Sequence, residues 1–502
     1  MEQYDIVIVG SGLGGLVCGA ILGKEGYRVC ILEKNRQIGG NLQTFVRHKC
    51  IFDSGVHYLG GLGEGQNLYQ VFKYLGIMDQ LKLKRMDMDA FDVVLFHDDD
   101  REFCLAQGRE NFIETLARQF PEEREALERY CDAIKYVCGK FPLYNLRHGS
   151  YFEKMEAVEI GAKSFIDSLT ENETLRQVLA GNNLLYAGEP DKTPFYVHAL
   201  VLNSYMESSW RCLDGGSQIA RLLLKEIKAN GGVVRKHAKV RLLHEENEAI
   251  QYAELDNGER IYGKRFISNI HPVKTLEMVD SALIRPVYRN RLKSLENSIS
   301  VFVMNIVMKK DSFPYYNRNF YCHKTRNVWD AMEYDEESWP KSYTLLFSAS
   351  SKSEEYAEGV TLMAYMRYDE VAQWADTFNT DSQAGDRGES YHAFKKRKAE
   401  KLLDLVEVKF PGFREHVHAW YAATPLSFRD YIGSDDGSMY GIAKDYKEPW
   451  RTFISPRTKI SNLFLTGQNL NLHGILGVTF SALVTCAELL GWEHVVEKIR
   501  RK

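Results

Sequence analysis

The chain has 502 residues, more than one hydrophobic core usually organises, so we expect two or more domains. Its 64 Lys and Arg residues against 68 Asp and Glu residues give a formal net charge of −4, which is too balanced for a dedicated nucleic-acid binder. Hydrophobic residues make up 44% and charged residues 26% of the chain, which excludes a wholly disordered protein.

The first forty residues contain a dinucleotide-binding pattern. Residues 4–9 predict a buried parallel strand, residues 16–24 have helical spacing, and residues 27–32 predict a second strand that ends at Glu33. The G-x-G-x-x-G turn between strand and helix suits a tight turn, close approach to a pyrophosphate and helix–sheet packing. Glu33 is placed to accept hydrogen bonds from a ribose diol. The glycines of the turn are Gly10, Gly12, Gly14 and Gly15.

The segment after Glu33 favours FAD over a nicotinamide cofactor. A second glycine pair, Gly39 and Gly40, would let the backbone pass under a larger, extended cofactor. The resulting E-x5-GG pattern and the F-D-S-G-V-H-Y run of residues 52–58 resemble flavoproteins that include phytoene desaturases and amine oxidases. Within that group the chain resembles most the all-trans-retinol 13,14-reductases (retinol saturases) and their bacterial relatives. The resemblance implies further cofactor contacts at Lys34 and Asn41.

The same resemblance implies an α/β fold. It comprises a split, Rossmann-like FAD-binding domain of the glutathione reductase and amine oxidase type, and an interleaved substrate domain of sheet plus helices. The expected FAD-binding segments are residues 1–85, 212–275 and 455–502. The expected substrate segments are residues 86–211, a helical lid, and residues 276–454.

The middle of the chain agrees with this division. Residues 219–229 predict an amphipathic helix, and a hairpin turns at residues 256–258. The resemblance implies that Val240 contacts the adenine through its backbone. In the second substrate segment, residues 301–308 and 360–366 are strand-like, whereas the polar residues 377–390 predict a mobile loop.

Near the C-terminus, a strand that begins at Leu463 and a turn precede an apolar helix that ends at about Leu490. The resemblance places this segment along the flavin, with the N-terminus of the helix at the pyrimidine edge. The positive end of a helix would stabilise an anionic flavin there. The candidate cofactor residues of this segment are Gly467, Gln468, Gly474 and Ile475.

Saturating a C=C bond requires a hydride on one carbon and a proton on its neighbour. His57 and Tyr58 follow the expected flavin-binding turn, and His473 precedes the terminal glycines, so these three are the candidate catalytic residues near the flavin. Hydrogen bonding to the backbone or flavin is the alternative role for both histidines. Tyr431 and Tyr440 are candidate residues of the substrate pocket, with core packing as the alternative.

The sequence therefore predicts an FAD-dependent oxidoreductase. By resemblance, it saturates a C=C bond of a lipophilic isoprenoid or polyene, either retinoid-like or carotenoid-like. Desaturation or isomerisation of a carotenoid is the alternative reaction. A non-catalytic alternative is a binding module like the proteins that escort prenylated GTPases, which have a similar fold. NAD(P)H could serve as an external reductant, although no second G-x-G-x-x-G follows a strand, and the electron partner is not identified.

The nine cysteines contain no C-x-x-C pair, which indicates neither a disulfide framework nor a zinc site, and we expect buried thiols. His416 and His418 alternate as on a strand, but no acid or cysteine cluster joins them, so no metal is expected. No secretory or membrane-spanning segment is expected, and residues 470–487 are typical of a buried helix. We expect a cytoplasmic protein. The basic runs at residues 395–398 and 498–502 fit a solvated helix face and a frayed terminus, with peripheral contact to anionic lipid as the alternative.

Overall fold

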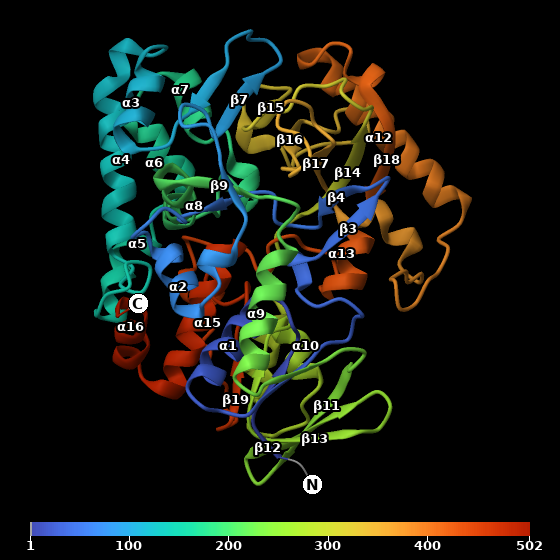
Figure 1. Ribbon diagram of the computed structural model, residues 1–502. Helices are drawn as coiled ribbons and strands as arrows, with labels where there is room; N and C mark the ends of the chain where they lie inside the picture. Colours follow the sequence, from blue (N-terminus) through green and yellow to red (C-terminus); the bar gives the residue numbers. More distant parts are fainter. Residues whose placement is uncertain (1–2, 502) are drawn as a thin grey trace.

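Two large β-sheets organise residues 3–501, which the computed structural model describes (Figure 1). The first sheet has the strand order β10-β2-β1-β13-β12-β11, and β19 pairs with β13. Strands β10, β2, β1, β13 and β19 run parallel, whereas β11, β12 and β13 form an antiparallel meander. The strands are β1 (Gln3–Val9), β2 (Val29–Leu32), β10 (Val233–Arg235), β11 (Val240–Glu246), β12 (Ala249–Leu255), β13 (Arg260–Ser268) and β19 (Leu463–Leu465).

Helix α1 (Leu13–Lys24) lies against this sheet, flanked by α9 (Ser217–Ala229) and α15 (Gly474–Leu490). Small residues allow the close approach, because a Cβ at Gly19 would lie 2.7 Å from Ile31 Cδ1 on β2. The predicted strand–turn–helix–strand unit is confirmed. Its helix begins at Leu13 rather than Leu16, since extended Gly12 is the N-cap, and β2 begins two residues later than expected.

The second sheet has the order β18-β14-β17-β16-β15-β7-β8. The predicted strands 301–308 and 360–366 are confirmed as β14 and β17. Residues 86–211, expected to be mainly helical, also supply β7 and β8, because β7 pairs in parallel with the distant β15. The strands are β7 (Asp92–Phe96), β8 (Phe103–Leu105), β14 (Ser300–Met308), β15 (Asn319–His323), β16 (Ser342–Phe347), β17 (Gly359–Met366) and β18 (Val417–Ala423).

A helical layer stands beside the second sheet, at the left of Figure 1. Its apolar side chains form one continuous core with those of α1 and α15. The layer comprises α3 (Arg109–Ala117), α4 (Arg124–Gly139), α5 (Met155–Val158), α6 (Ala162–Leu169), α7 (Glu173–Leu179) and α8 (Phe195–Glu207). The residue limits of the five expected domain segments remain a prediction.

Shorter elements connect these layers. Two small sheets pair β3 with β4 and order β5-β9-β6. The strands are β3 (Thr44–Arg47), β4 (Cys50–Asp53), β5 (Leu59–Gly60), β6 (Leu83–Arg85) and β9 (Ser209–Cys212); the helices are α2 (Asn67–Leu75), α10 (Pro272–Glu277), α11 (Pro286–Lys293), α13 (Pro425–Ile432), α14 (Pro449–Thr452) and α16 (Trp492–Arg500).

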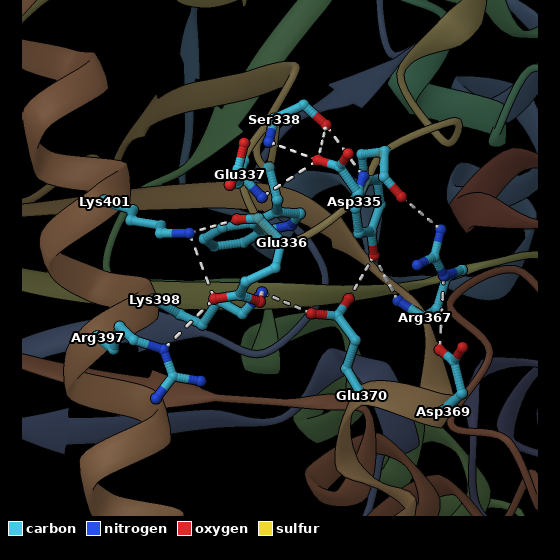
Figure 2. Close-up of polar contacts among 12 residues, drawn as sticks. Asp335, Glu336, Glu337, Ser338, Arg367, Asp369, Glu370, Arg397, Lys398 and Lys401 are labelled. Carbon is cyan, nitrogen blue, oxygen red and sulfur yellow. Dashed lines mark hydrogen bonds and ion pairs between the residues drawn. The ribbon is translucent and has the colours of Figure 1, made fainter.

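Helix α12 (Glu389–Lys409) packs on the second sheet and corrects one expectation about the basic run 395–398. Lys398 is fully buried rather than part of a solvated face. Its ammonium lies 2.8 Å from Glu336 Oε2 and 2.6 Å from Glu370 Oε2, and the Tyr334 hydroxyl donates to the other Glu370 oxygen (Figure 2). A buried cation requires such partners, and they attach α12 to the loops at the sheet edge.

The structure also shows the surroundings of the cysteines and of the C-terminal basic run. All nine cysteines are free and all but Cys104 are buried, as predicted. Of the C-terminal basic run, Lys498 and Arg501 pair with Glu25 and Glu497, while Lys502 lies outside the described residues. None of the helices in residues 3–501 is both long and apolar enough to traverse a bilayer.

Candidate functional site

A cavity of about 470 Å³ lies between the two sheets. One wall is formed by the loops at the carboxyl ends of β1, β2 and β19, and the opposite wall by one face of the second sheet. All the candidate cofactor, catalytic and pocket residues named above line this cavity, except Gly15. The sequence motifs, which are spread over more than four hundred residues, therefore meet at one place.

The glycine turn after β1 needs residues without side chains for different reasons. Gly10 has φ +93°, a left-handed conformation that favours glycine. Gly15 faces away from the cavity, and a Cβ there would lie 2.2 Å from the Gly10 carbonyl oxygen. Gly15 thus sets the helix–sheet contact, whereas Gly12 and Gly14 border the cavity at the N-terminus of α1.

Asn269, which directly follows β13, also meets this turn. When its carboxamide is oriented so that both the oxygen and the nitrogen have hydrogen-bond partners, the oxygen accepts hydrogen bonds from Gly15 N at 3.2 Å and Gly12 N at 3.3 Å. This residue is not among the site residues predicted from the sequence. The available signal was its position at the carboxyl end of a parallel strand, where α/β proteins bind ligands.

Glu33 directly follows β2 and is 5% exposed. Its carboxylate accepts hydrogen bonds from Ser11 N at 3.0 Å, Ser11 Oγ at 2.6 Å and Asn35 N at 2.8 Å. These bonds fix its orientation. A carboxylate has about four acceptor positions, so acceptor capacity remains for a diol in the cavity.

The second glycine pair packs directly on the first turn. Gly39 pairs with Gly12 in an isolated bridge, and Gly39 N donates to the Ser11 carbonyl at 3.0 Å. Gly39 and Gly40 have φ +110° and +56°, and a Cβ at Gly40 would lie 3.2 Å from Gly12 Cα. The neighbouring Asn41 lines the cavity.

The C-terminal segment closes the same cavity. Gly467 adopts φ +102° and Gly474, the first residue of α15, adopts φ +72° with open space where a Cβ would lie. No side chain caps α15 at its N-cap residue His473. Its backbone N–H groups and the positive helix end therefore remain available to a ligand in the cavity.

The two candidate histidines are neutral at neutral pH. Burial lowers the pKa of His473 to about 4, and burial together with the nearby Arg211 guanidinium lowers the pKa of His57 to about 4. His473 Nε2 donates to the Leu185 carbonyl at 2.9 Å, and its ring stacks on Tyr440 at 4.0 Å between centroids. These contacts favour a positioning role for His473 over an imidazolium acid.

Tyr58 has a different environment. Its hydroxyl lies 2.9 Å from Asp92 Oδ2 and 2.7 Å from the Tyr321 hydroxyl, and its ring stacks on Tyr205. Tyr321 and Tyr205 line the cavity, while Asp92 lies behind them with no exposed surface. Asp92 and Tyr321 were missed. A single acid within the otherwise apolar run 91–96 was the available signal for Asp92.

The remaining candidates lie at separate parts of the wall. Tyr440 is deep in the cavity and donates to the Leu184 carbonyl at 3.0 Å. Tyr431 hydrogen-bonds to Asp381 of the loop 377–388 instead. Lys34 donates to the Asp430 carbonyl at 3.0 Å, and burial lowers its pKa.

The loop itself is attached to α13 (Pro425–Ile432). Arg387 and the backbone N–H of Asn379 both bond to buried Asp430. Val240, at the start of β11, also lines the cavity.

The wall on the second sheet is mainly apolar. Because side chains alternate along a strand, Thr344 and Leu346 of β16 and Met363 and Tyr365 of β17 face the cavity, and Val301 of β14 joins them. The Tyr365 and Thr344 hydroxyls have no hydrogen-bond partner among the described residues. This wall suits an apolar ligand.

Residues 3–501 contain no group of three or more His, Cys, Asp or Glu side chains that could hold a metal ion. His418 packs edge-on against His48, with ring centroids 4.9 Å apart, whereas His416 lies beside Phe313.

The sequence is similar to those of known proteins along nearly its whole length. A sequence model of NAD(P)-binding Rossmann-like domains matches residues 8–75. All-trans-retinol 13,14-reductase from Danio rerio is 26% identical over 530 residues, which cover 97% of this chain and 86% of that protein. Prolycopene isomerase from Daucus carota, a chloroplastic protein, is 23% identical over 512 residues, which cover 97% and 80%. The chain is a homologue of both.

The resemblance that the motifs indicate is therefore confirmed. Putrescine oxidase, in a structure with bound putrescine, aligns over 100% of both chains with a TM-score of 0.65 and 13% identity, which shows a shared fold. The predicted fold class is confirmed as well. A Rossmann-like domain that suits a dinucleotide-type cofactor is interleaved with a second unit of sheet and helices.

Proposed function

We propose that this chain is an FAD-dependent oxidoreductase that saturates a C=C bond of an apolar isoprenoid or polyene. The observation that carries the proposal is the continuity of one cavity. It runs from Glu33 and the glycine turn to the apolar face of the second sheet, so a dinucleotide and a lipophilic substrate could meet inside it. Near-full-length relatives named retinol reductases and prolycopene isomerases support the reaction and substrate class.

The chain's residues fit FAD from one end to the other. Glu33 would bind the ribose, with Val240 beside the adenine and Lys34 near it. Gly12 and Gly14 line the cavity at the N-terminus of α1, where a pyrophosphate is favoured, while the Gly12 N–H itself is bonded to the Asn269 side chain.

The flavin end would lie among Gly39–Asn41, Gly467–Gln468 and Gly474–Ile475. Open space at Gly474 and the uncapped start of α15 leave room for the ring and supply donors to its polar edge. His57 and Tyr58 would border it on another side.

When bound, the flavin supplies hydride transfer to a substrate carbon. The protein's contribution is to exclude water, orient the substrate and provide a proton. The apolar wall on the second sheet excludes water, and Tyr440, fixed by His473 and the Leu184 carbonyl, orients the substrate. Neutral His57 and His473 do not act as cationic acids, which leaves Tyr58 as the proposed proton-bearing candidate of the three.

Carotenoid isomerisation or desaturation is the second candidate reaction, supported by the prolycopene isomerase relatives. The same cavity would serve hydride transfer in either direction. The alternative of a non-catalytic binding protein, like those that escort prenylated GTPases, loses support because Glu33 and all the glycines at the cavity rim are present. Protein that stays colourless after addition of FAD would restore it.

The test is anaerobic. Purified yellow protein is photoreduced and mixed with all-trans-retinol or a carotenoid while the flavin absorbance and the product mass are followed. We expect the oxidised flavin spectrum to return, with a product two hydrogens heavier. If the flavin remains reduced with all tested polyenes, saturation is contradicted, and the oxidised protein should next be given a more saturated carotenoid. NAD(P)H as external reductant and contact with a membrane surface remain predictions.

A further inference from the structure

A buried carboxylic acid stands directly behind the apolar cavity. Asp92 begins β7 and has no exposed surface. Three side chains contact it: the Tyr58 hydroxyl at 2.9 Å, Asn319 Nδ2 at 2.9 Å and Asn182 Nδ2 at 3.2 Å. Burying an acid costs free energy unless it is compensated, so its presence beside a lipophilic site requires an explanation.

The acid is connected to the cavity through two tyrosines. Tyr58 bonds to Asp92 on one side and to Tyr321 on the other, with 2.7 Å between the two hydroxyl oxygens. Both tyrosines line the cavity. Asp92, Tyr58 and Tyr321 thus form a continuous chain of exchangeable protons that ends at the substrate wall.

The hydrogen-bonded series Asp92–Tyr58–Tyr321 also has a buried countercharge. Arg211 is 1% exposed, and its guanidinium donates to Asn319 Oδ1 at 2.8 Å. Asn319 in turn donates to Asp92, so one amide links the arginine to the acid. The other guanidinium bonds go to the carbonyls of Phe347 and Arg318. A negative charge on Asp92 is therefore balanced without a direct ion pair.

The hydrogen bonds among Asp92, Tyr58 and Tyr321 can run in either of two directions, depending on the protonation of Asp92. If Asp92 is ionised, it only accepts, so Tyr58 donates to it and Tyr321 donates to Tyr58. If Asp92 is protonated, it can donate to Tyr58, and Tyr58 can donate to Tyr321. The Tyr321 proton is then free to point at the contents of the cavity. One proton on the acid decides whether a proton faces the substrate.

We propose that Asp92, Tyr58 and Tyr321 form the proton relay of the saturation reaction, with Tyr321 as the residue that touches substrate. This inference rests on the proposed function and names its proton source. When bound and reduced, FAD would supply the hydride for one alkene carbon. The second carbon takes the Tyr321 proton, Tyr321 takes that of Tyr58, and Tyr58 takes that of Asp92. Asp92 ends as a carboxylate, and water returns one proton to it after product leaves.

The acidity of the relay agrees with this cycle. Burial raises the pKa of Asp92 to about 6. The titratable groups that face it are Tyr58, Tyr321, Tyr205 and Arg211. Burial raises the pKa of each tyrosine, and Arg211 keeps its proton even though burial lowers its pKa, because guanidinium groups are not deprotonated in proteins.

His57, whose pKa is about 4, faces Arg211 and is neutral above that pH. Asp92 is therefore the group of this cluster that titrates between pH 5 and 8. The fraction of molecules in which Asp92 is protonated therefore decreases as the pH rises through about 6, the pKa of this acid.

The experiment compares Asp92→Asn and Tyr321→Phe, which preserve side-chain shape, with wild type. Tyr343→Phe is the control, because Tyr343 precedes Thr344 on β16 and faces away from the cavity. Photoreduced holoenzyme is mixed with all-trans-retinol over pH 5 to 8, and flavin reoxidation and retinol affinity are measured separately. Infrared difference spectra between pH 5 and 8, recorded without substrate, report the protonated carboxyl.

We expect both relay variants to slow reoxidation by about 100-fold or more, within the usual range for general acid catalysis, with unchanged retinol affinity. The wild-type rate should decrease above about pH 6, and Asp92→Asn should remove that dependence. A carboxyl band should disappear in Asp92→Asn. Desolvation also raises the pKa values of Asp53 and Glu207, so the variant is needed to assign the band.

Three outcomes would overturn the relay. They are variants that react at the wild-type rate, weaker retinol affinity with unchanged rate (which would make the tyrosines binders of a substrate oxygen), and an infrared spectrum that Asp92→Asn does not alter. Wild-type holoenzyme that reacts with no polyene would instead refute the proposed function, and the relay with it.

Discussion

At the scale of single residues, the glycines of the first turn separate packing from ligand contact. Gly15 is the one candidate residue outside the cavity, and its Cβ position is only 2.2 Å from the Gly10 carbonyl oxygen. That oxygen belongs to backbone and cannot move aside cheaply. Gly15→Ala should therefore lower the melting temperature even without cofactor.

The matched control is Gly139→Ala, at the last residue of α4, where a Cβ meets no atom within 4 Å. We expect no loss there, because alanine is about 1 kcal/mol better than glycine inside a helix. Scanning calorimetry of both apoproteins measures the difference. Equal melting temperatures for the two variants would show that Gly15 matters only through ligand binding.

A second residue-scale prediction concerns His198 on α8. It is fully buried between the hydroxyls of Tyr130 at 2.6 Å and Tyr186 at 2.8 Å, and burial lowers its pKa to about 3. An unfolded histidine titrates near 6.5, so the unfolded chain binds the extra proton first as the pH falls. The contribution of His198 to stability is complete above about pH 6.5 and is lost progressively as the pH falls towards 3.

His198→Gln removes this dependence. Between pH 7.5 and 5, the free energy of unfolding of wild type should decrease by about 2 kcal/mol more than that of the variant, from 1.36 kcal/mol per pH unit below 6.5. Urea unfolding at the two pH values measures it, with the exposed His148→Gln as control. Identical pH dependence in wild type and His198→Gln would show that the pKa of His198 is the same in the folded and the unfolded chain.

At the scale of elements, α12 depends on Lys398. The buried ammonium is held by Glu370, itself only 13% exposed, and by the half-exposed Glu336. Lys398→Ala leaves the mostly buried Glu370 without its cation, and we expect a loss of about 3–5 kcal/mol in the free energy of unfolding. Lys401→Ala is the control, because Lys401 pairs with the same Glu336 from the surface, which is worth about 0–1 kcal/mol.

Denaturant titration of the two variants shows whether the buried ion pair of Lys398 contributes to the free energy of unfolding. Similar midpoints for Lys398→Ala and Lys401→Ala would mean that water replaces the buried contacts. In that case α12 would be held by its apolar side chains alone.

The elements also show what the sequence could predict. The glycine turn, Glu33 and the two strands around them were predictable because a phosphate, a ribose and a close helix contact each demand particular residue types at fixed spacing. The pairing of β7 with β15 was not, since a run such as 91–96 carries no information about which distant strand it joins. Asp92, Tyr321 and Asn269 escaped for the same reason, because long-range pairing alone brings them to the cavity.

At the scale of the whole molecule, one apolar core and the cavity each include residues from both units. One continuous apolar core joins α1 and α15 of the first unit to the helical layer and to Phe96 and Phe103 of the second sheet. A core shared in this way should make the chain unfold in a single transition. The cavity is likewise lined by both sheets, so a ligand inside it contacts both sides of the fold.

FAD should therefore shift the entire unfolding transition upwards. At a free FAD concentration of about 100 times Kd, binding to the folded state alone stabilises it by about 2.7 kcal/mol. Ile475→Trp would fill the flavin end of the cavity and abolish this shift. Val287→Trp is the matched control, because Val287 is 80% exposed on α11 and does not line the cavity.

Calorimetry with and without FAD measures both effects. Two transitions of which FAD moves only one would show that the two units unfold separately and that the ligand is held by one of them. A full shift in Ile475→Trp would place the flavin outside the cavity, because a tryptophan at the first turn of α15 leaves no room for the ring beside Gly474.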